Sequence, residues 1–115
     1  TLAEYCHLTL PENKIDGVSL VKLINSDRAE TPHREFYWQC LGSKENPQWA
    51  VRDGDWKLLH NPIEARPGDL DENKLMLINI RKDTTERTNL AAKYPDIVSK
   101  MKKKHENWLQ EVVNQ

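Results

Sequence analysis

The chain has 115 residues, enough for one domain with a modest core, and only 37% of them are hydrophobic, although four tryptophans can each bury a large area. Seventeen basic residues against eighteen acidic ones give a formal net charge of −1, which argues against a nucleic-acid-binding protein because such proteins normally carry a basic excess. No apolar run approaches the roughly 18 residues that a membrane span needs, so no membrane partner is expected either.

No signal peptide is recognisable, but the sequence begins at Thr1, so we expect a processed protein or a piece of a longer one. The two cysteines, Cys6 and Cys40, are too few for a disulfide scaffold or a four-ligand zinc site. We interpret them as two buried free thiols; a Cys6–Cys40 disulfide is the alternative.

The first part of the chain predicts short helices. Residues 1–8 resemble the end of a helix, which the proline that follows them terminates. Asp16 can cap a second helix that runs to about Asn25. The polar stretch 26–34 predicts a surface connection.

Residues 35–41, EFYWQCL, predict a strand with Phe36, Trp38 and Cys40 on one face and Tyr37 on the other. The loop GSKENP follows.

The stretch AVRDGDWKLLH predicts a β-hairpin with Asp53-Gly54 at its turn, because a type I′ turn needs two residues that tolerate positive φ. The register then pairs, from the turn outward, Arg52 with Asp55, Val51 with Trp56, Ala50 with Lys57 and Trp49 with Leu58. One face is the apolar set Trp49, Val51, Trp56 and Leu58. On the other face, an Arg52–Asp55 pair would contribute about 0.2–1 kcal/mol.

Residues 61–73 form a long loop rich in proline, glycine and acidic residues, which favours either a functional or a disordered segment. Residues 74–80 predict a third sheet segment, and residues 81–94 a turn that leads into a short helical piece. Pro95 begins the last helix. Its apolar stripe consists of Ile97, Val98, Met101, Trp108, Leu109 and Val112, with His105 at the edge of the core. Its basic run, Lys100 and Lys102 to Lys104, predicts a solvated face.

The expected architecture is therefore α+β, a small antiparallel sheet of three to four strands packed by a long C-terminal helix. Catalytic chemistry is not expected from these residues. Neither the adjacent Cys6 and His7 nor the spacing of His33 and Cys40 matches a metal-ligand pair. No serine or cysteine has a nucleophile motif, and no glycine-rich phosphate loop is present. We therefore expect no catalytic residue and no metal site in this chain.

Four blocks, IDGVSLVKLIN, PHREFYW, WAVRDGDWKLL and LINIRKDTTERTNLAAKYPDIVSKM, fit one pattern together. In order and spacing they resemble the C-terminal region of sulfatases of the arylsulfatase type. That region reads approximately D-G-x-S-L-x-P-L-L, H-R-x-x-x-W, A-V-R-x-G-x-W-K-L and L-Y-D-L-x-x-D-P-x-E-x-x-N-L-A. The match runs from about Leu2 to Trp108, with departures at Lys22, Ile78 and Thr84, where the family often has proline, tyrosine and proline.

The resemblance implies that a large α/β catalytic domain precedes this smaller domain. Residues 1–30 would be a helical lead-in from that upstream domain, and residues 31–115 the sheet-plus-helix subdomain. Sulfatases of this family hydrolyse sulfate esters with a formylglycine, made from the cysteine of a C-x-P/S-x-R motif, and with calcium or magnesium. The sequence has no such motif, so the resemblance places the nucleophile and the metal ligands upstream of Thr1 and leaves no cofactor in this chain.

The resemblance also implies that loops of the smaller domain shape the substrate pocket. His60, Asn61 and Arg66, at the start of the long loop, are then the expected substrate-binding residues; a strand end and a solvated arginine are the alternative. His33 and Arg34 are weaker candidates. The substrate would be a sulfated carbohydrate or an aryl sulfate, and the parent protein would be periplasmic, secreted or lysosomal.

Two functions remain open on the sequence. The first is the C-terminal fragment of a sulfuric ester hydrolase, structural and pocket-shaping, whose bare interdomain surface would let the isolated chain self-associate. The second is an independent carbohydrate- or protein-binding module with a flat aromatic patch.

Overall fold

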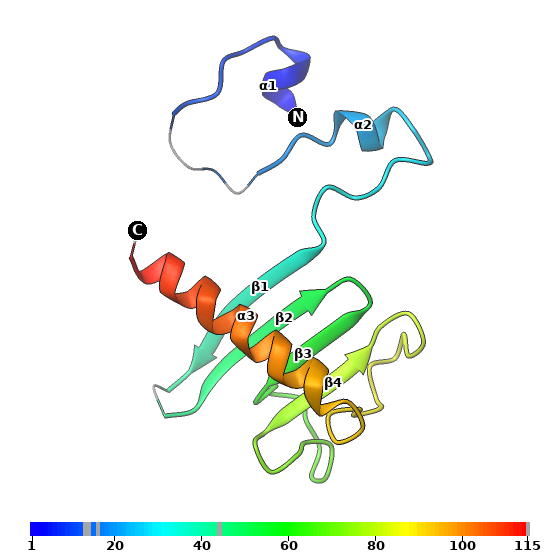
Figure 1. Ribbon diagram of the computed structural model, residues 1–115, viewed down its shortest axis with the longest axis vertical. Coiled ribbons are helices and arrows are strands. Elements are labelled where there is room, and N and C mark those ends of the chain that lie inside the picture. The colour runs from blue at the N-terminus through cyan, green and yellow to red at the C-terminus, as the bar shows by residue number, and fades with distance from the viewer. Residues whose placement is uncertain (13–14, 16, 44, 115) are drawn as a thin grey trace. The chain divides into compact units, whose positions relative to one another are not determined.

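The computed structural model describes residues 1–12, 15, 17–43 and 45–114 (Figure 1). The chain divides into two compact units, Thr1–Arg34 and Glu35–Gln115. Within the described residues, no helix combines the length and apolar character that crossing a membrane requires.

The first unit contains two one-turn helices, α1 (Leu2–Tyr5) and α2 (Val21–Ile24), neither of which has a buried residue. The backbone N–H of Leu20 donates a 2.8 Å hydrogen bond to the hydroxyl of Thr1. The second helix is shorter than predicted, with Leu20 at its N-cap, and the predicted cap Asp16 lies outside the described residues. Large apolar side chains of this unit are exposed, namely Leu2, Tyr5, Leu8, Leu10, Ile15, Val18, Leu20, Leu23 and Ile24.

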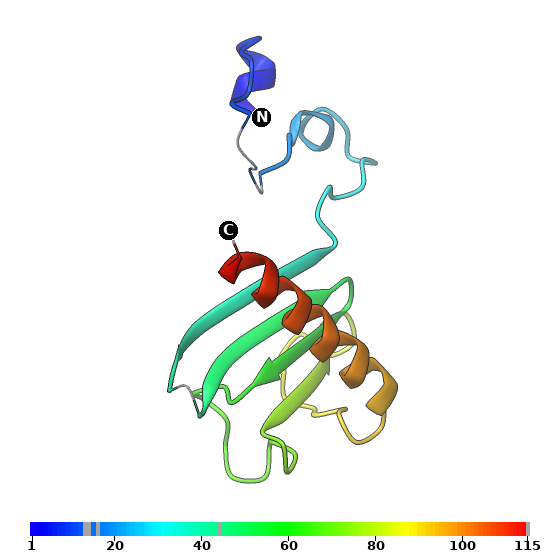
Figure 2. The same cartoon turned by 60° about the vertical axis from the view of Figure 1, so that its left-hand side comes forward.

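The second unit is a four-stranded antiparallel sheet covered on one face by a long helix, which confirms the predicted α+β class. The strands are β1 (Glu35–Gly42), β2 (Pro47–Asp53), β3 (Trp56–His60) and β4 (Leu75–Asn79), and they pair in chain order. The helix α3 (Pro95–Val113) crosses the strands on one side of the sheet (Figure 2).

The hairpin forms as predicted in its faces but not in its register. Val51 pairs with Leu58 and Asp53 with Trp56, so the two turn residues are Gly54 and Asp55. Gly54 carries the positive φ of 60°. Each partner has moved by two residues relative to the predicted register, and a shift of two leaves every side chain on its predicted face.

The predicted Arg52–Asp55 ion pair was wrong for the same reason. Nε of Arg52 donates to the carbonyl oxygen of Gly54 at 3.1 Å, and the carboxylate of Asp55 lies 3.7 Å from Arg81.

The core lies between the sheet and α3. Val51, Leu58 and Leu77 are completely buried, and Met101 of α3 packs on them. Half-buried aromatic and aliphatic residues surround this cluster, namely Tyr37, Trp49, Trp56, Leu90, Tyr94, Ile97 and Val98. Of the apolar stripe predicted for the last helix, Ile97, Val98 and Met101 pack in this cluster, whereas Val112 is exposed.

Three further predictions need correction. Residues 81–94 form turns and not a short helix, because the carboxylate of Asp83 accepts hydrogen bonds from the backbone N–H groups of Arg87 (2.9 Å) and Thr88 (2.7 Å), which holds them in a turn. The two cysteines are free but exposed, not buried.

The third correction concerns Lys104, which does not belong to the solvated face. Its ammonium binds the carboxylates of Glu35 and, at 2.7 Å, of Asp53, and thereby connects α3 to β1 and β2. Lys100, Lys102 and Lys103 are exposed, as predicted.

Candidate functional site

His60 ends β3 on the face that α3 covers. Its Nδ1 lies 2.6 Å from the carbonyl oxygen of Pro47, and its ring stacks on Trp49 with 5.3 Å between centroids. It lines a cavity of about 390 Å³ with Trp49, Lys102 and His105. This environment holds the ring of His60 in a defined orientation.

His105 stacks on Trp49, with 4.2 Å between centroids, so that Trp49 stacks with two histidines. Only 6% of the residue is exposed, and its Nε2 has no hydrogen-bond partner within the part of the chain that the structure describes. Burial lowers the pKa of His105, and the neighbouring Glu106 only partly opposes this effect. The prediction of a histidine at the edge of the core agrees with this position.

Asn61 adopts a left-handed conformation, with φ of 50°, at the start of the long loop. Its backbone N–H donates to Lys74 at 2.8 Å, and its Nδ2 donates to the carbonyl oxygen of Asn46 at 3.4 Å. These contacts join the loop to its own far end and to the β1–β2 connection.

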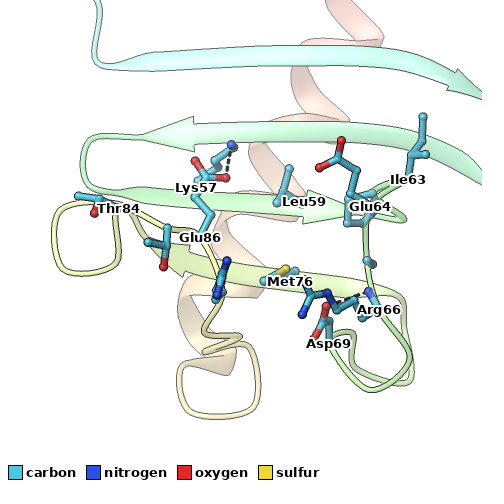
Figure 3. Close-up of a pocket in the computed structure, with 13 residues that line it drawn as sticks. Lys57, Leu59, Ile63, Glu64, Arg66, Asp69, Met76, Thr84 and Glu86 are labelled. Carbon is cyan, nitrogen blue, oxygen red and sulfur yellow. Dashed lines mark hydrogen bonds and ion pairs between the residues drawn. The ribbon is translucent and has the colours of Figure 1, made fainter.

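Arg66 lines a different cavity, on the sheet face away from α3 (Figure 3). This cavity measures about 670 Å³. Leu59 of β3 and Met76 of β4 form its floor, and residues 62–69 and 84–87 form its walls. Because Leu59 and His60 are consecutive in β3, their side chains point to opposite faces of the sheet. The structure therefore separates His60 from Arg66.

Charged groups of this second cavity come from two loops and one strand. Lys57 of β3 pairs with Glu86 at 2.5 Å across the cavity wall. Arg87 also lines the cavity, together with Glu64 and Asp69. Sequence reasoning missed Arg87; the available signal was that Arg87 lies directly after Glu86 in the block LINIRKDTTERTNLAAKYPDIVSKM.

Asn89 joins the two walls of this cavity. Its Nδ2 donates to the carbonyl oxygens of Asp69 (2.8 Å) and Leu75 (2.9 Å), and its Oδ1 accepts from the backbone N–H groups of Leu77 (3.0 Å) and Ala91 (2.9 Å). One amide side chain thus satisfies four backbone groups, two of them in a buried strand.

The carboxylate of Asp83 organises the second wall. It accepts hydrogen bonds from two backbone N–H groups and from the hydroxyl of Thr85 at 2.8 Å. The hydrogen bonds from the backbone N–H of Thr88 and from Thr85 lower the pKa of Asp83 to about 2. Asp83 is therefore a turn-forming carboxylate at neutral pH.

An aromatic cluster of Phe36 and Trp38 lies on the same sheet face, on β1. Their rings stack with 5.9 Å between centroids, Trp38 is 48% exposed, and the guanidinium of Arg52 lies 5.7 Å from the centre of the Phe36 ring. The weaker candidates His33 and Arg34 belong to the first unit, where His33 is half-buried and Arg34 exposed.

Among the residues that the structure describes, no group of three or more histidines, cysteines and carboxylates is arranged to hold a metal ion.

Comparisons with known proteins found similarity only at the level of structure. No family model matches the chain, and no curated protein matches it. The structure of BT4656 in complex with its substrate D-glucosamine-2-N,6-O-disulfate is similar with a TM-score of 0.67 at 17% sequence identity over 100% of this chain. A second structure, BT33336S-sulf, described with the metabolism of multiple glycosaminoglycans by Bacteroides thetaiotaomicron, has a TM-score of 0.60 at 20% identity over 99% of this chain.

The chain spans 23% of the length of each of these two proteins. At these identities the comparisons establish a shared fold. The whole of this chain, sheet and helix included, therefore corresponds to a smaller part of two much longer proteins.

Proposed function

We propose that this chain is the smaller, non-catalytic domain of a formylglycine-dependent sulfatase of the arylsulfatase type. The observation that carries the proposal is that all of the chain shares its fold with part of a protein whose substrate is a disulfated glucosamine. The four ordered sequence blocks support it independently. In this proposal the nucleophile and the calcium or magnesium ion belong to an upstream domain, which is also the chief partner of this chain.

The residues of the matched blocks have structural roles that suit such a domain. Lys57 and Glu86 pair between a strand and a loop, and Asp83 and Asn89 satisfy backbone groups around the same cavity. Loss of a buried hydrogen-bond partner costs about 1–3 kcal/mol. These residues of the sequence blocks would therefore maintain the shape of the domain. The proposed contribution to activity is thus a fixed wall beside an active site.

The substrate we propose for the parent protein is a sulfated carbohydrate. Both similar structures are described in connection with sulfated glucosamine or glycosaminoglycans, and an aryl sulfate is the alternative. His60, Asn61 and Arg66 remain the proposed substrate-side residues of this domain. Since His60 and Arg66 lie on opposite faces of the sheet, the two side chains would serve different contacts.

The test is to determine the reading frame upstream of Thr1 and to express the whole protein and this chain separately. We expect a C-x-P/S-x-R motif upstream, and release of sulfate from glucosamine 6-sulfate or from an aryl sulfate by the whole protein alone. An upstream frame without the motif would overturn the proposal. Metal-dependent turnover by the isolated chain would overturn it as well.

The stacking of the exposed Trp38 on the half-buried Phe36 favours a second candidate, an independent carbohydrate-binding module. Aromatic faces bind the apolar faces of sugar rings, and Trp38 is half exposed beside a stacked partner. In this case Trp38→Ala would abolish binding of the isolated chain to neutral sugars, whereas a domain of a sulfatase would show no such binding to lose.

A further inference from the structure

The cavity between residues 62–69 and 84–87 has the properties of a ligand site. Its volume of about 670 Å³ lies within the range of roughly 300–1,000 Å³ that small-molecule sites occupy. It is larger than three other cavities lined by described residues, which measure about 390, 320 and 570 Å³. Its floor is apolar, with Leu59 half-buried and Met76 buried.

Two arginines face this cavity from opposite walls. Arg66 comes from the loop after β3, and Arg87 from the loop after β4. Both residues are exposed, and neither guanidinium takes part in an ion pair or hydrogen bond with any residue in the described ranges. The third cation, Lys57, is neutralised by Glu86 at 2.5 Å. The cavity therefore offers two available guanidinium groups.

The backbone of each arginine is held in place. The N–H of Arg66 donates to the carboxylate of Asp69 at 2.8 Å, and the N–H of Arg87 donates to Asp83 at 2.9 Å. Asn89 connects the two walls through the carbonyl oxygen of Asp69. Walls fixed in this way reduce the entropy lost when a ligand binds, so the site is preorganised.

We propose that this cavity binds an anionic saccharide, with Arg66 and Arg87 contacting its sulfate or carboxylate groups. The planar guanidinium suits both anions because it donates two parallel hydrogen bonds. The apolar floor suits the face of a sugar ring, and the carboxylates of Glu64 and Asp69 can accept hydrogen bonds from its hydroxyl groups. The same two carboxylates disfavour a densely charged polyanion such as a nucleic acid.

This inference shares its ligand class with the proposed function but does not require an upstream catalytic domain. Binding is measured with residues 1–115 alone, so failure to bind would leave the sulfatase proposal standing. Conversely, an upstream frame without the formylglycine motif would leave a measured saccharide affinity unchanged. The two proposals can therefore fail separately.

The experiment titrates the chain with two disaccharides, one sulfated without a carboxylate and one with a uronic carboxylate but no sulfate. Calorimetry gives the Kd, and the methyl resonance of Met76 reports occupation of the floor. We expect saturable binding of at least one disaccharide, which identifies the anion. Arg66→Gln and Arg87→Gln should each weaken that binding about tenfold, as expected for loss of a hydrogen bond to a charged group.

Arg81→Gln is the matched control, because Arg81 belongs to the same loop as Arg87, is 80% exposed and does not line the cavity. It should leave both the Kd and the Met76 shift unchanged. All three variants should keep the melting temperature of the parent chain, since the backbone hydrogen bonds of Arg66 and Arg87 do not involve their side chains. No binding of either disaccharide, or equal weakening by Arg81→Gln, would overturn the proposal.

Discussion

At the scale of single residues, the charged and polar groups of this chain that are most buried serve packing. His105 is enclosed by Trp49 and Trp108, and Asp53 is 9% exposed and bound to Lys104. The contacts of both groups give measurable consequences for the free energy of unfolding.

The burial of His105 leads us to predict that the native state loses stability in mild acid. Its pKa is lowered by burial in the folded state, so below the unfolded value of about 6.5 the unfolded chain binds more protons and the free energy of unfolding falls as the pH falls. The facing charged groups are His60, Lys102 and Glu106. Chemical denaturation between pH 7.5 and 5 measures this slope.

The variant His105→Phe keeps an aromatic ring on Trp49 and removes the titration, so we expect a shallower slope in that pH range. His7→Asn is the control, because His7 is exposed and asparagine tolerates its positive φ of 54°. A slope that is unaffected by His105→Phe, or that is lost with His7→Asn, contradicts the assignment.

We expect substitution of Lys104 to lower the free energy of unfolding more than its position in the basic run of α3 would indicate. Burial alone would lower the pKa of Lys104, but its hydrogen bonds to Asp53 and Glu35 outweigh burial and raise it. Lys104→Met would remove the ammonium that binds the carboxylates of Asp53 and Glu35, and we expect a loss of about 2–3 kcal/mol in urea denaturation. Lys103→Met, on the exposed face, should change stability by less than about 0.5 kcal/mol. Equal losses in the two variants would show that the ion pairs are not the cause.

At the scale of elements, the hairpin shows where sequence reasoning ends. Asp53-Gly54 and Gly54-Asp55 both make two-residue turns, and both leave Val51 and Leu58 on the core face, so local pattern cannot choose between them. The observed register places Asp53 beside Lys104 and Trp56 against Tyr94, with 5.2 Å between ring centroids. These contacts are tertiary, and no window of sequence contains them.

Substitution of Gly54 tests the observed turn. Its φ of 60° is costly for a residue with a Cβ, so Gly54→Ala should lower the free energy of unfolding by about 1–2 kcal/mol. Gly17→Ala is a matched control because an added Cβ there meets no atom within 4 Å and the backbone has no positive φ. Thermal unfolding of both variants gives the comparison, and a neutral Gly54→Ala would argue for a different turn.

Part of the fold and of the candidate site could be predicted from the sequence. The strands and α3 follow from period-two and period-3.6 patterns. The loop after His60 was expected to carry substrate-binding residues, which stays a prediction, and in the structure its Arg66 lines a cavity. Arg87 was missed because it lies 21 positions further along the chain and approaches the same cavity only after β4 has turned back beside β3. The burial of the cysteines was mispredicted because Cys6 directly follows a helix that has no buried residue, and Cys40 lies where the pairing of β1 with β2 is irregular.

At the scale of the whole molecule, the two units differ in what they bury. The core residues all belong to Glu35–Gln115, whereas the helices of Thr1–Arg34 contain no buried residue. A surface with many exposed apolar side chains normally contacts another protein or another part of the same one. In the proposed parent, the upstream domain would be that contact.

Removal of the first unit should therefore leave the second one intact. We expect residues 35–115 to melt within about 4 °C of the full chain. Light scattering should show self-association of the full chain and a monomer for residues 35–115. A monomeric full chain, or an unfolded truncated one, would contradict this division of roles.

The strand order has a consequence for how the chain folds. Every strand pairs with its neighbour in sequence, so the sheet is assembled from short-range contacts that form quickly. Its apolar face, however, is completed by Met101 and His105, which lie about fifty positions after Val51 and Trp49. During synthesis the apolar face of the sheet, with Trp49 and Trp56, therefore stays uncovered until α3 has been made. Docking of that helix is the event that ends the period in which the nascent chain is open to aggregation.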